Sequence, residues 1–327
     1  MKAIVCTEYG PLEVLRLSEV DTPRPNDNEI LIRIVATTVT SADWRARSLT
    51  VPTGFGLLFR WAFGVSRPRQ PILGSEPAGE VESVGRHVSK FNVGGEVLAF
   101  SDARMGCHAQ YKCMPEDGTI ALKPPNLTFE EAAALSFGAT TALAFLRKGK
   151  LRSGETILIN GASGAVGTVA VQLAKHFGAE VTGVCSTANV ELVRSLGASH
   201  VIDYTNEDFT HNGAAYDVIV DTVGTAPYSR SKGSLNEGGR LLLVLAGLPD
   251  MLPSPWVSLT SSKKNLAAAA PRGAEDLRYL AELAEAGHFK PVIDRRYPFE
   301  RIAEAHRFYV DTGRKKGNVI ITVDHDD

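Results

Sequence analysis

The stretch Thr156-Ile157-Leu158-Ile159-Asn160-Gly161-Ala162-Ser163-Gly164-Ala165-Val166-Gly167 sets the architecture of the chain. Residues 156–159 favour a strand, and the apolar residues after the turn recur at the spacing of one helix face. Gly161 permits the turn, Gly164 lets a diphosphate approach the main chain, and Gly167 lets the helix pack closely on the strand. The sequence therefore predicts a dinucleotide site, with the diphosphate at the helix N-terminus, where unpaired N–H groups favour an anion.

This stretch has two other interpretations. The first is a tight strand-to-helix turn that binds no ligand. The second is a membrane span, because residues 156–174 carry no charge. The glycines and the polar residues Asn160, Ser163, Thr168 and Gln172 argue against a span, which needs about twenty mostly apolar residues.

Composition narrows the class of protein. A length of 327 residues is typical of two domains, and a net charge of −2 excludes a basic field suited to nucleic acid. The N-terminus lacks an apolar signal core, so a cytoplasmic location is expected. Four cysteines lie far apart without a Cys-x-x-Cys pair, which predicts neither a disulfide framework nor a four-thiolate zinc site.

Strand patterns dominate the first third of the chain. Short apolar runs separated by glycine and proline predict a small barrel. The expected strands cover residues 2–7, 14–20, 29–36, 78–84, 96–99 and 109–113. Residues 49–70 have no strand alternation, which indicates a long loop or a short helix.

From Thr128 onward the pattern changes. Thr128 and Glu131 form a capping box that predicts a helix through residue 134, and a second helix is expected at 140–148. Strands and helices then alternate, which predicts a parallel sheet with helices on both faces. The strands are expected at 156–159, 180–185, 200–202, 217–221, 240–245 and 265–269, and the helices at 165–177, 189–196 and 228–235. An amphipathic helix at 275–286, a strand at 292–295, a helix at 299–309 and a strand at 319–323 follow, and the last strands could return to the barrel.

Several motifs carry a resemblance to a known family. They are Gly74-Ser75-Glu76-Pro77-Ala78-Gly79-Glu80-Val81, residues 135–142, residues 160–167, Val184-Cys185-Ser186-Thr187, Asp221-Thr222-Val223-Gly224 and Lys316-Gly317-Asn318-Val319. Across essentially the whole chain, the sequence resembles the medium-chain dehydrogenase/reductase superfamily, in its zinc-lacking quinone oxidoreductase-like branch. The resemblance implies an α/β fold: a GroES-like β-barrel domain from residues 1–122 and 288–327, and a doubly wound parallel-sheet Rossmann domain from residues 123–287. The cofactor would lie in the cleft between them.

Two substitutions depart from the zinc-dependent members that the chain resembles. Those members place a catalytic Cys where Thr40 stands and a His where Ser75 stands. Zinc catalysis requires three N, S or O ligands and an open position. The sequence therefore predicts no catalytic metal, and Glu76 is expected to bond within the barrel.

The end of the second parallel strand bears on the choice of cofactor. An NAD-selective fold ends this strand with Asp or Glu, whereas here it ends Cys185-Ser186-Thr187. Hydroxyl groups accommodate a 2′-phosphate, so NADPH is the expected cofactor, with strand-end capping as the alternative role for Ser186. The resemblance implies that Ser186 and Tyr204 contact the phosphate, although Ala188 and Asn189 stand where relatives often have Lys or Arg.

The remaining cofactor contacts are implied by the resemblance. Thr140 would lie near the nicotinamide. The residues expected to bind cofactor are Thr140, Gly161, Ser163, Gly164, Ala165, Val166, Gly167, Ser186, Thr187, Tyr204, Val223, Gly224, Ala246, Gly247, Lys316 and Asn318. A structural role is equally open for Thr140, Val223, Gly224, Ala246, Gly247, Lys316 and Asn318.

The expected chemistry is hydride transfer from the cofactor, with the protein stabilising the negative oxygen that forms. Candidate donors are Thr40, Ser41 and Arg45, and Asp43 is expected to cap the helix that begins there. The leading hypothesis is an NADPH-dependent reductase of quinones or activated alkenes. A carbonyl/alcohol oxidoreductase and an NADPH-binding sensor or partner protein with little turnover remain alternatives.

Two further expectations concern surfaces. The apolar side chains of residues 49–70 are too many for a solvated loop, so we expect Phe55, Leu58, Phe59, Trp61 and Phe63 to bury. We predict that Phe59, Trp61 and Phe63 form one wall of an acceptor pocket; the alternative is that they cap the barrel core or a subunit contact. The apolar segment 265–270, near the expected edge of the parallel sheet, predicts a homodimer.

Overall fold

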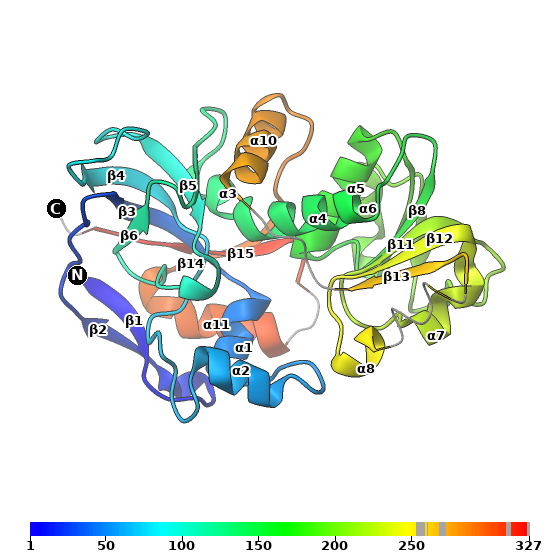
Figure 1. Cartoon of the computed structure of the whole chain (residues 1–327), viewed down its shortest axis with the longest axis horizontal. Helices are drawn as coiled ribbons and strands as arrows, with labels where there is room; N and C mark the ends of the chain where they lie inside the picture. Colours follow the sequence, from blue (N-terminus) through cyan, green and yellow to red (C-terminus); the bar gives the residue numbers. More distant parts are fainter. Residues whose placement is uncertain (253–258, 260, 268–272, 312–314, 326–327) are drawn as a thin grey trace.

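The computed structural model describes residues 1–252, 259, 261–267, 273–311 and 315–325. Figure 1 shows two lobes, one built around a mostly antiparallel sheet, called here the antiparallel sheet, and the other around a parallel sheet. Helix α4 (Ser136–Lys148) runs between them, and α10 (Ala274–Glu285) packs on both α4 and a strand of the antiparallel sheet. The expected α/β fold, a GroES-like barrel with a Rossmann domain, is confirmed.

The antiparallel lobe is assembled from both ends of the chain. Its seven-stranded sheet contains β3 (Glu29–Val39), β4 (Ala78–Val84), β5 (Glu96–Phe100), β6 (Tyr111–Pro115), β7 (Thr119–Leu122), β14 (Ile293–Pro298) and β15 (Asn318–Thr322). A two-stranded sheet of β1 (Lys2–Cys6) and β2 (Leu15–Glu19) accompanies it. β15 pairs antiparallel with β3, so that Val319 lies opposite Val39. The expected return of the C-terminal strand to the barrel is therefore confirmed.

The parallel lobe is a six-stranded sheet in the order β10-β9-β8-β11-β12-β13. Its strands are β8 (Thr156–Asn160), β9 (Glu180–Cys185), β10 (His200–Asp203), β11 (Tyr216–Asp221), β12 (Leu235–Leu243) and β13 (Lys264–Ala267). The chain winds outward in both directions from the central pair β8 and β11. Ligands of such sheets bind beyond the carboxyl ends of the strands at this switch point.

The helices follow the sequence signals closely. Thr128 and Glu131 form the expected capping box at the start of α3 (Phe129–Ala133), and Gly178 and Gly197 take positive φ where helices end. The other helices are α1 (Ser41–Ser48), α2 (Gly56–Phe63), α5 (Ala165–His176), α6 (Val190–Ser195), α7 (Tyr228–Ser231), α8 (Leu248–Met251) and α11 (Ile302–Asp311). α11 covers β14, β15 and β3 of the antiparallel sheet (Figure 1).

Three expectations need correction. β7 has only four residues and was not expected. The helix expected at 228–235 is only α7 followed by a 3₁₀ turn, Lys232–Ser234. β12 begins at Leu235 rather than at 240, because residues 236–239 bulge out between the pairs Tyr216–Leu235 and Val218–Arg240. Of the strand expected at 265–269, residues 268 and 269 lie outside the described residues.

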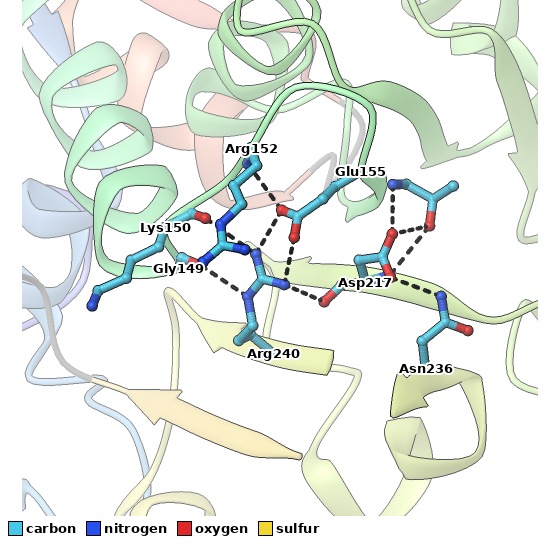
Figure 2. A network of polar contacts seen from close by, with 8 residues as sticks. Gly149, Lys150, Arg152, Glu155, Asp217, Asn236 and Arg240 are labelled. Carbon is cyan, nitrogen blue, oxygen red and sulfur yellow. Dashed lines mark hydrogen bonds and ion pairs between the residues drawn. The ribbon is translucent and has the colours of Figure 1, made fainter. Parts of the chain in front are cut away.

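A network of charged groups ties together the amino ends of β8, β11 and β12 (Figure 2). The guanidinium of Arg240 donates to both carboxylate oxygens of Glu155, at 3.0 and 2.7 Å, and to the carbonyl of Gly149, at 2.9 Å. The carboxylate of Asp217 accepts from the main chain and hydroxyl of Thr156 and from the amide of Asn236. This network lies at the opposite end of β8 from the glycine-rich turn and therefore serves stability.

The segment 49–70 forms a short helix, α2, between two loops. Of the two structures expected for it, a long loop or a short helix, the short helix is the one observed. The expectation that all its large apolar side chains bury is wrong for Leu58 and Trp61, because α2 has neighbours on one side only. Phe59 and Phe63 lie on that side, with ring centroids 4.2 Å apart, and pack against Ala46, Leu73 and Met105.

No helix in the part of the chain that the structure describes is long and apolar enough to cross a bilayer.

Candidate active site

The glycine-rich turn has the geometry that its sequence predicts. Gly161 has φ +82°, and a Cβ there would lie 2.5 Å from the hydroxyl of Thr222. A Cβ on Gly167 would fall 2.1 Å from the carbonyl oxygen of Gly161, so only glycine allows α5 to pack this closely on the turn. By contrast, a Cβ on Gly164 would meet only one atom, at 3.5 Å. The surface above Gly164, at the N-terminus of α5, is therefore open to an anion.

A buried carboxylate shapes the neighbouring loop. Asp221, at the end of β11, accepts hydrogen bonds from the main-chain N–H groups of Val223, Gly224 and Ala226. It also accepts from the side-chain amide of Asn160, at the end of β8, with an N–O distance of 3.0 Å. These bonds hold the two strand ends and the loop at 222–226 in one fixed arrangement at the switch point of the sheet.

A cavity of about 470 Å³ lies at the carboxyl ends of β8, β9 and β11. Its lining is partly apolar and partly polar and consists of Asn160, Gly161, Val184, Tyr204, Glu207, Asp208, Phe209, Val223, Thr225 and Arg230. The position beside Gly161 and the apolar wall fit the adenosine half of a dinucleotide.

The carboxylate of Asp203, on β10, lies beside the end of β9, and the sequence did not indicate it. The hydroxyl of Thr187 donates to the carboxylate of Asp203, at 2.6 Å, and Asp203 pairs with Cys185 across the β9–β10 ladder. Hydrogen bonds from Thr187, Thr205 and Asn206 lower the pKa of Asp203. A carboxylate is thus present near the expected 2′-phosphate position, contributed by the adjacent strand. The neighbouring Ser186 hydroxyl accepts from the side chain of Asn189, at 3.3 Å.

A second cavity, of about 300 Å³, lies between the two lobes. The antiparallel lobe contributes Ser41, Trp44, Arg45, Tyr309 and Lys315, and the other wall consists of Phe137, Gly164, Ala165, Val166, Thr222, Val223, Val244 and Leu245. The opening above Gly164 thus faces Ser41 and Arg45. A third cavity, of about 260 Å³, shares Trp44, Arg45, Val223 and Leu245 with it and extends to residues 50–53, Gly224 and Gly247.

The three candidate donors near residue 40 have different surroundings. Thr40 is the N-cap of α1: its hydroxyl donates to Asp43, at 2.7 Å, and accepts from the main chain of Ala42. Asp43 completes the capping box, as expected, and also accepts from the main chain of Gly74, at 2.8 Å. Thr40 therefore positions α1, whereas Ser41 and Arg45, one turn apart on that helix, line the interlobe cavity. Burial lowers the pKa of Arg45, but a guanidinium remains charged.

Glu76 joins the two lobes. One carboxylate oxygen accepts from the hydroxyl of Thr38 in the barrel, as expected, and the other accepts from the main chain of Phe137 in α4. Complete burial raises the pKa of Glu76 to about 7, against the opposing effect of these two hydrogen bonds. Phe137 lines the interlobe cavity, so this bond fixes part of its wall.

The donor set at this corner does not fit zinc. Thr40 is engaged as a helix cap, and the buried hydroxyl of Ser75 has no partner among the described residues. No group of three or more His, Cys, Asp or Glu side chains in the described parts of the chain could hold a metal ion.

The other expected cofactor residues are distributed around the cavities. Val223 lines all three cavities, and Gly224 and Gly247 line the third. Thr140 is fully buried behind the wall, where its hydroxyl donates to the carbonyl of Ser136, at 2.6 Å. Ala246 packs, half-buried, against the core between the sheet and α7.

The C-terminal strand approaches the glycine-rich turn, where the main chain of Gly317 donates to the carbonyl of Ser163, at 2.8 Å. Asn318 donates to the carbonyl of Val292, and Lys316 is exposed, with its main chain bonded to Asp294. Lys315, rather than Lys316, lines the interlobe cavity, and its ammonium lies 3.9 Å from the ring centroid of Tyr309. In a Lys-Lys doublet the sequence does not show which side chain faces the site.

Phe59, Trp61 and Phe63, expected as a pocket wall, do not line any of these three cavities. Phe59 and Phe63 pack against the barrel side, and Trp61 is exposed. Trp44 and residues 50–53, which precede α2, line the third cavity instead.

Comparisons with known proteins agree with this geometry. Residues 26–126 match the family "Alcohol dehydrogenase GroES-like domain", and residues 196–321 match "Zinc-binding dehydrogenase". The chain is 34% identical to 2-methylene-furan-3-one reductase of Solanum lycopersicum, over 98% of this chain and 79% of the relative. It is 30% identical to NADPH-dependent alkenal/one oxidoreductase, chloroplastic, of Arabidopsis thaliana, over the same shares. The solved structure of the quinone oxidoreductase from Coxiella burnetii superimposes with a TM-score of 0.87, at 28% identity and over 99% of both chains.

The nucleotide fold and the interlobe cavity define a dehydrogenase-type oxidoreductase. The chain belongs to the quinone oxidoreductase-like branch of the medium-chain dehydrogenase/reductase superfamily.

Proposed function

We propose that the protein is a zinc-independent, NADPH-dependent reductase of quinones or activated alkenes. The observation that carries the proposal is the interlobe cavity, in which the open surface at Gly164 faces Ser41 and Arg45 across apolar walls. The names of the relatives support the acceptor class: one reduces a furanone, one an alkenal or enone, and one a quinone.

We propose a place for each part of the cofactor. The cavity beside Gly161 would hold the adenosine, and the N-terminus of α5 the diphosphate. The nicotinamide half would reach the interlobe cavity past Val223. NADPH, when bound, supplies the hydride.

Arg45 would then bind the acceptor oxygen and stabilise the negative charge that develops on it, with Ser41 as a second donor one helical turn away. A quinone or enone suits this site because it accepts hydride with help from hydrogen bonds alone. A simple alcohol or aldehyde gains more from a Lewis acid, for which the corner of Thr40 and Ser75 offers no ligand set.

NADPH is the proposed cofactor because the hydroxyl residues Ser186 and Thr187 directly follow β9 and because one relative is named as NADPH-dependent. Asp203 opposes this preference, so we expect NADPH to bind several-fold rather than many hundred-fold more tightly than NADH. We further propose a homodimer that pairs across β13, at the edge of the parallel sheet, and a cytoplasmic location.

The test is oxidation of NADPH and NADH with a panel of benzoquinones, naphthoquinones, enones, enals and saturated aldehydes. We expect turnover with quinones or α,β-unsaturated carbonyls, unchanged after dialysis against a chelator. Elemental analysis of untagged protein should show far less than one zinc per chain. Preferential turnover of saturated aldehydes that chelation abolishes would contradict the proposal, and tight NADPH binding without turnover would favour a sensor.

A further inference from the structure

Helix α2 has two apolar faces, and only one of them is covered. Phe59 and Phe63 stack on each other and pack against Ala46, Leu73 and Met105. Leu57, Leu58 and Trp61 face away from that cluster, with exposed fractions of 85%, 58% and 71%. Trp61 lies four residues after Leu57 and three after Leu58, so it is a neighbour of both on the helix surface. When large apolar side chains gather on an exposed helix face, that face is more often an interaction site than a surface without function.

The charge around this face has one sign. Residues 44–75 contain five arginines and no aspartate or glutamate. Arg60, Arg67 and Arg69 are exposed. The guanidinium of Arg60 donates to the carbonyl of Val65, at 2.6 Å, which holds this charge beside exposed Val65. An exposed Leu-Leu-Trp face beside exposed arginines is the pattern of a helix that lies in a lipid headgroup layer.

The apolar surface continues onto the parallel lobe. The carbonyl of Thr53, in the loop before α2, accepts from the main chain of Leu248 in α8, at 2.9 Å. Leu248 and Leu252 are also exposed. Figure 1 shows α2 and α8 along the same side of the molecule, below the two sheets. The acid of α8, Asp250, accepts from the main chain of Gly247, at 3.1 Å, as the cap of that helix.

We propose that α2 docks the protein on an anionic lipid bilayer, with Leu57, Leu58 and Trp61 inserted among the headgroups and Arg60, Arg67 and Arg69 against the lipid phosphates. A second copy of the chain fits this surface less well, because a two-fold contact would place the arginines of one copy against those of the other. The docking itself does not depend on the proposed reaction.

The position of α2 has a consequence for access to the site, and this consequence rests on the proposed function. Residues 50–53 line the third cavity and precede α2 directly. Docking through α2 would therefore bring the mouth of that cavity close to the bilayer, where an apolar quinone would be dissolved.

The test is co-flotation of the full-length protein with vesicles on a density gradient. Vesicles of phosphatidylcholine alone are compared with vesicles that contain phosphatidylglycerol as well, each at low and high salt. We expect the protein to float with the anionic vesicles only, and high salt to reduce the bound fraction at least several-fold. The double variant Leu58→Ser/Trp61→Ser should lose at least ten-fold in partitioning, and Arg67→Glu/Arg69→Glu should lose a similar factor.

The matched control is Val93→Ser, which removes an exposed apolar side chain from the loop between β4 and β5 and should bind vesicles as the unmodified protein does. Circular dichroism and the melting temperature confirm that each variant folds. Reduction of a water-soluble quinone in the absence of vesicles should be the same in all variants, which separates failure of docking from failure of the proposed reaction.

Three results would overturn the proposal. The first is that the unmodified protein does not float with anionic vesicles. The second is that Leu58→Ser/Trp61→Ser floats as well as the unmodified protein. The third is that this variant floats equally well but has a lower molar mass in solution. The last result would assign the face to a second copy of the chain.

Discussion

The carboxylate of Glu76, in the barrel, accepts a hydrogen bond from the main-chain N–H of Phe137 at the start of α4. A side chain of one lobe thus caps a helix that belongs to the other. The same carboxylate accepts from Thr38, and Phe137 lines the interlobe cavity. This contact therefore couples the ionisation of one buried group to the fit between the lobes.

The first prediction concerns this ionisation. Burial raises the pKa of Glu76 from 4.5 to about 7, so the folded state holds its proton over a pH range in which the unfolded state has lost it. The contribution of Glu76 to the free energy of unfolding is fully present below pH 4.5, falls as the pH rises to about 7, and is constant above that. Its full size is on the order of 3 kcal/mol. Glu76→Gln, a neutral mimic of the protonated acid, should remove this decline in urea unfolding measured from pH 4.5 to 8; curves of the same slope for both proteins would contradict it.

The second prediction concerns Arg45. Arg45→Met should reduce kcat/KM for quinone or enone by about 10²-fold, because a charged donor to the developing oxyanion is lost. The dissociation constant of NADPH should change less than two-fold, since Arg45 belongs to the wall of the cavity that the antiparallel lobe contributes, and not to the glycine-rich turn proposed to bind the cofactor. Arg104→Met, in the 3₁₀ turn after β5, is the control and should match the unmodified protein in both measurements. Equal kinetics for the two variants would remove Arg45 from the proposed mechanism.

The third prediction concerns cofactor choice. Asp203→Asn removes a negative charge that lies 2.6 Å from the hydroxyl of Thr187, near the expected 2′-phosphate. NADPH affinity should rise several-fold and NADH affinity should stay constant, whereas Ser186→Asp should abolish the preference for NADPH. Fluorescence titration measures both constants, and Asp27→Asn in the barrel is the matched control. An unchanged ratio in both Asp203→Asn and Ser186→Asp would place the 2′-phosphate elsewhere.

The fourth prediction concerns the network at the amino end of the parallel sheet. Arg240→Ala leaves the mostly buried carboxylate of Glu155 without its main partner and should lower the free energy of unfolding by about 2–3 kcal/mol. Arg194→Ala, which breaks an exposed pair with Glu191, should cost less than about 1 kcal/mol. Urea unfolding measures both, and kcat of the folded Arg240→Ala protein should be unchanged because the network lies far from the glycine-rich turn. Equal losses of unfolding free energy in the two variants would show that burial does not determine how much these ion pairs contribute to stability.

The fifth prediction concerns assembly. β13 is an edge strand of the parallel sheet among the described residues, and its outer edge can pair with that of a second copy around a two-fold axis. Light scattering after size exclusion should therefore give twice the mass of the chain at micromolar concentration. A monomer at that concentration would contradict the dimer and leave the edge to be covered by the chain itself.

Local patterns made most of the fold predictable. The alternation from β8 to β11 was predicted to within two residues, because glycines with positive φ, such as Gly178, end the helices where the sequence indicates. The start of β12 was not predicted, because residues 236–239 have the composition of a turn but bulge out of a continuing strand. The local pattern left the return of the last strands to the barrel open, and the family resemblance implied it, since no local signal joins segments so far apart as β15 and β3.

The site was predictable where it depends on the main chain and less so where it depends on neighbouring strands. Gly161 and Gly167 have the close approaches that were predicted for them. Asp203 escaped notice because it reaches the end of β9 from β10, and Lys315 because it is adjacent to the residue chosen by resemblance. The exposure of Trp61 could not be predicted, because hydrophobicity does not say whether a neighbour is present to cover a side chain.

The pairing of β15 with β3 also has a consequence during synthesis. Residues 36–39 gain β15 as a partner only after the ribosome has added Val319, 280 residues after Val39. At a typical rate of 5–20 residues per second, this edge stays open for roughly 15–55 s, while the whole parallel lobe emerges. An open edge of this kind invites pairing with other chains. Until β15 is synthesised, this edge of the barrel is therefore exposed to pairing with other chains.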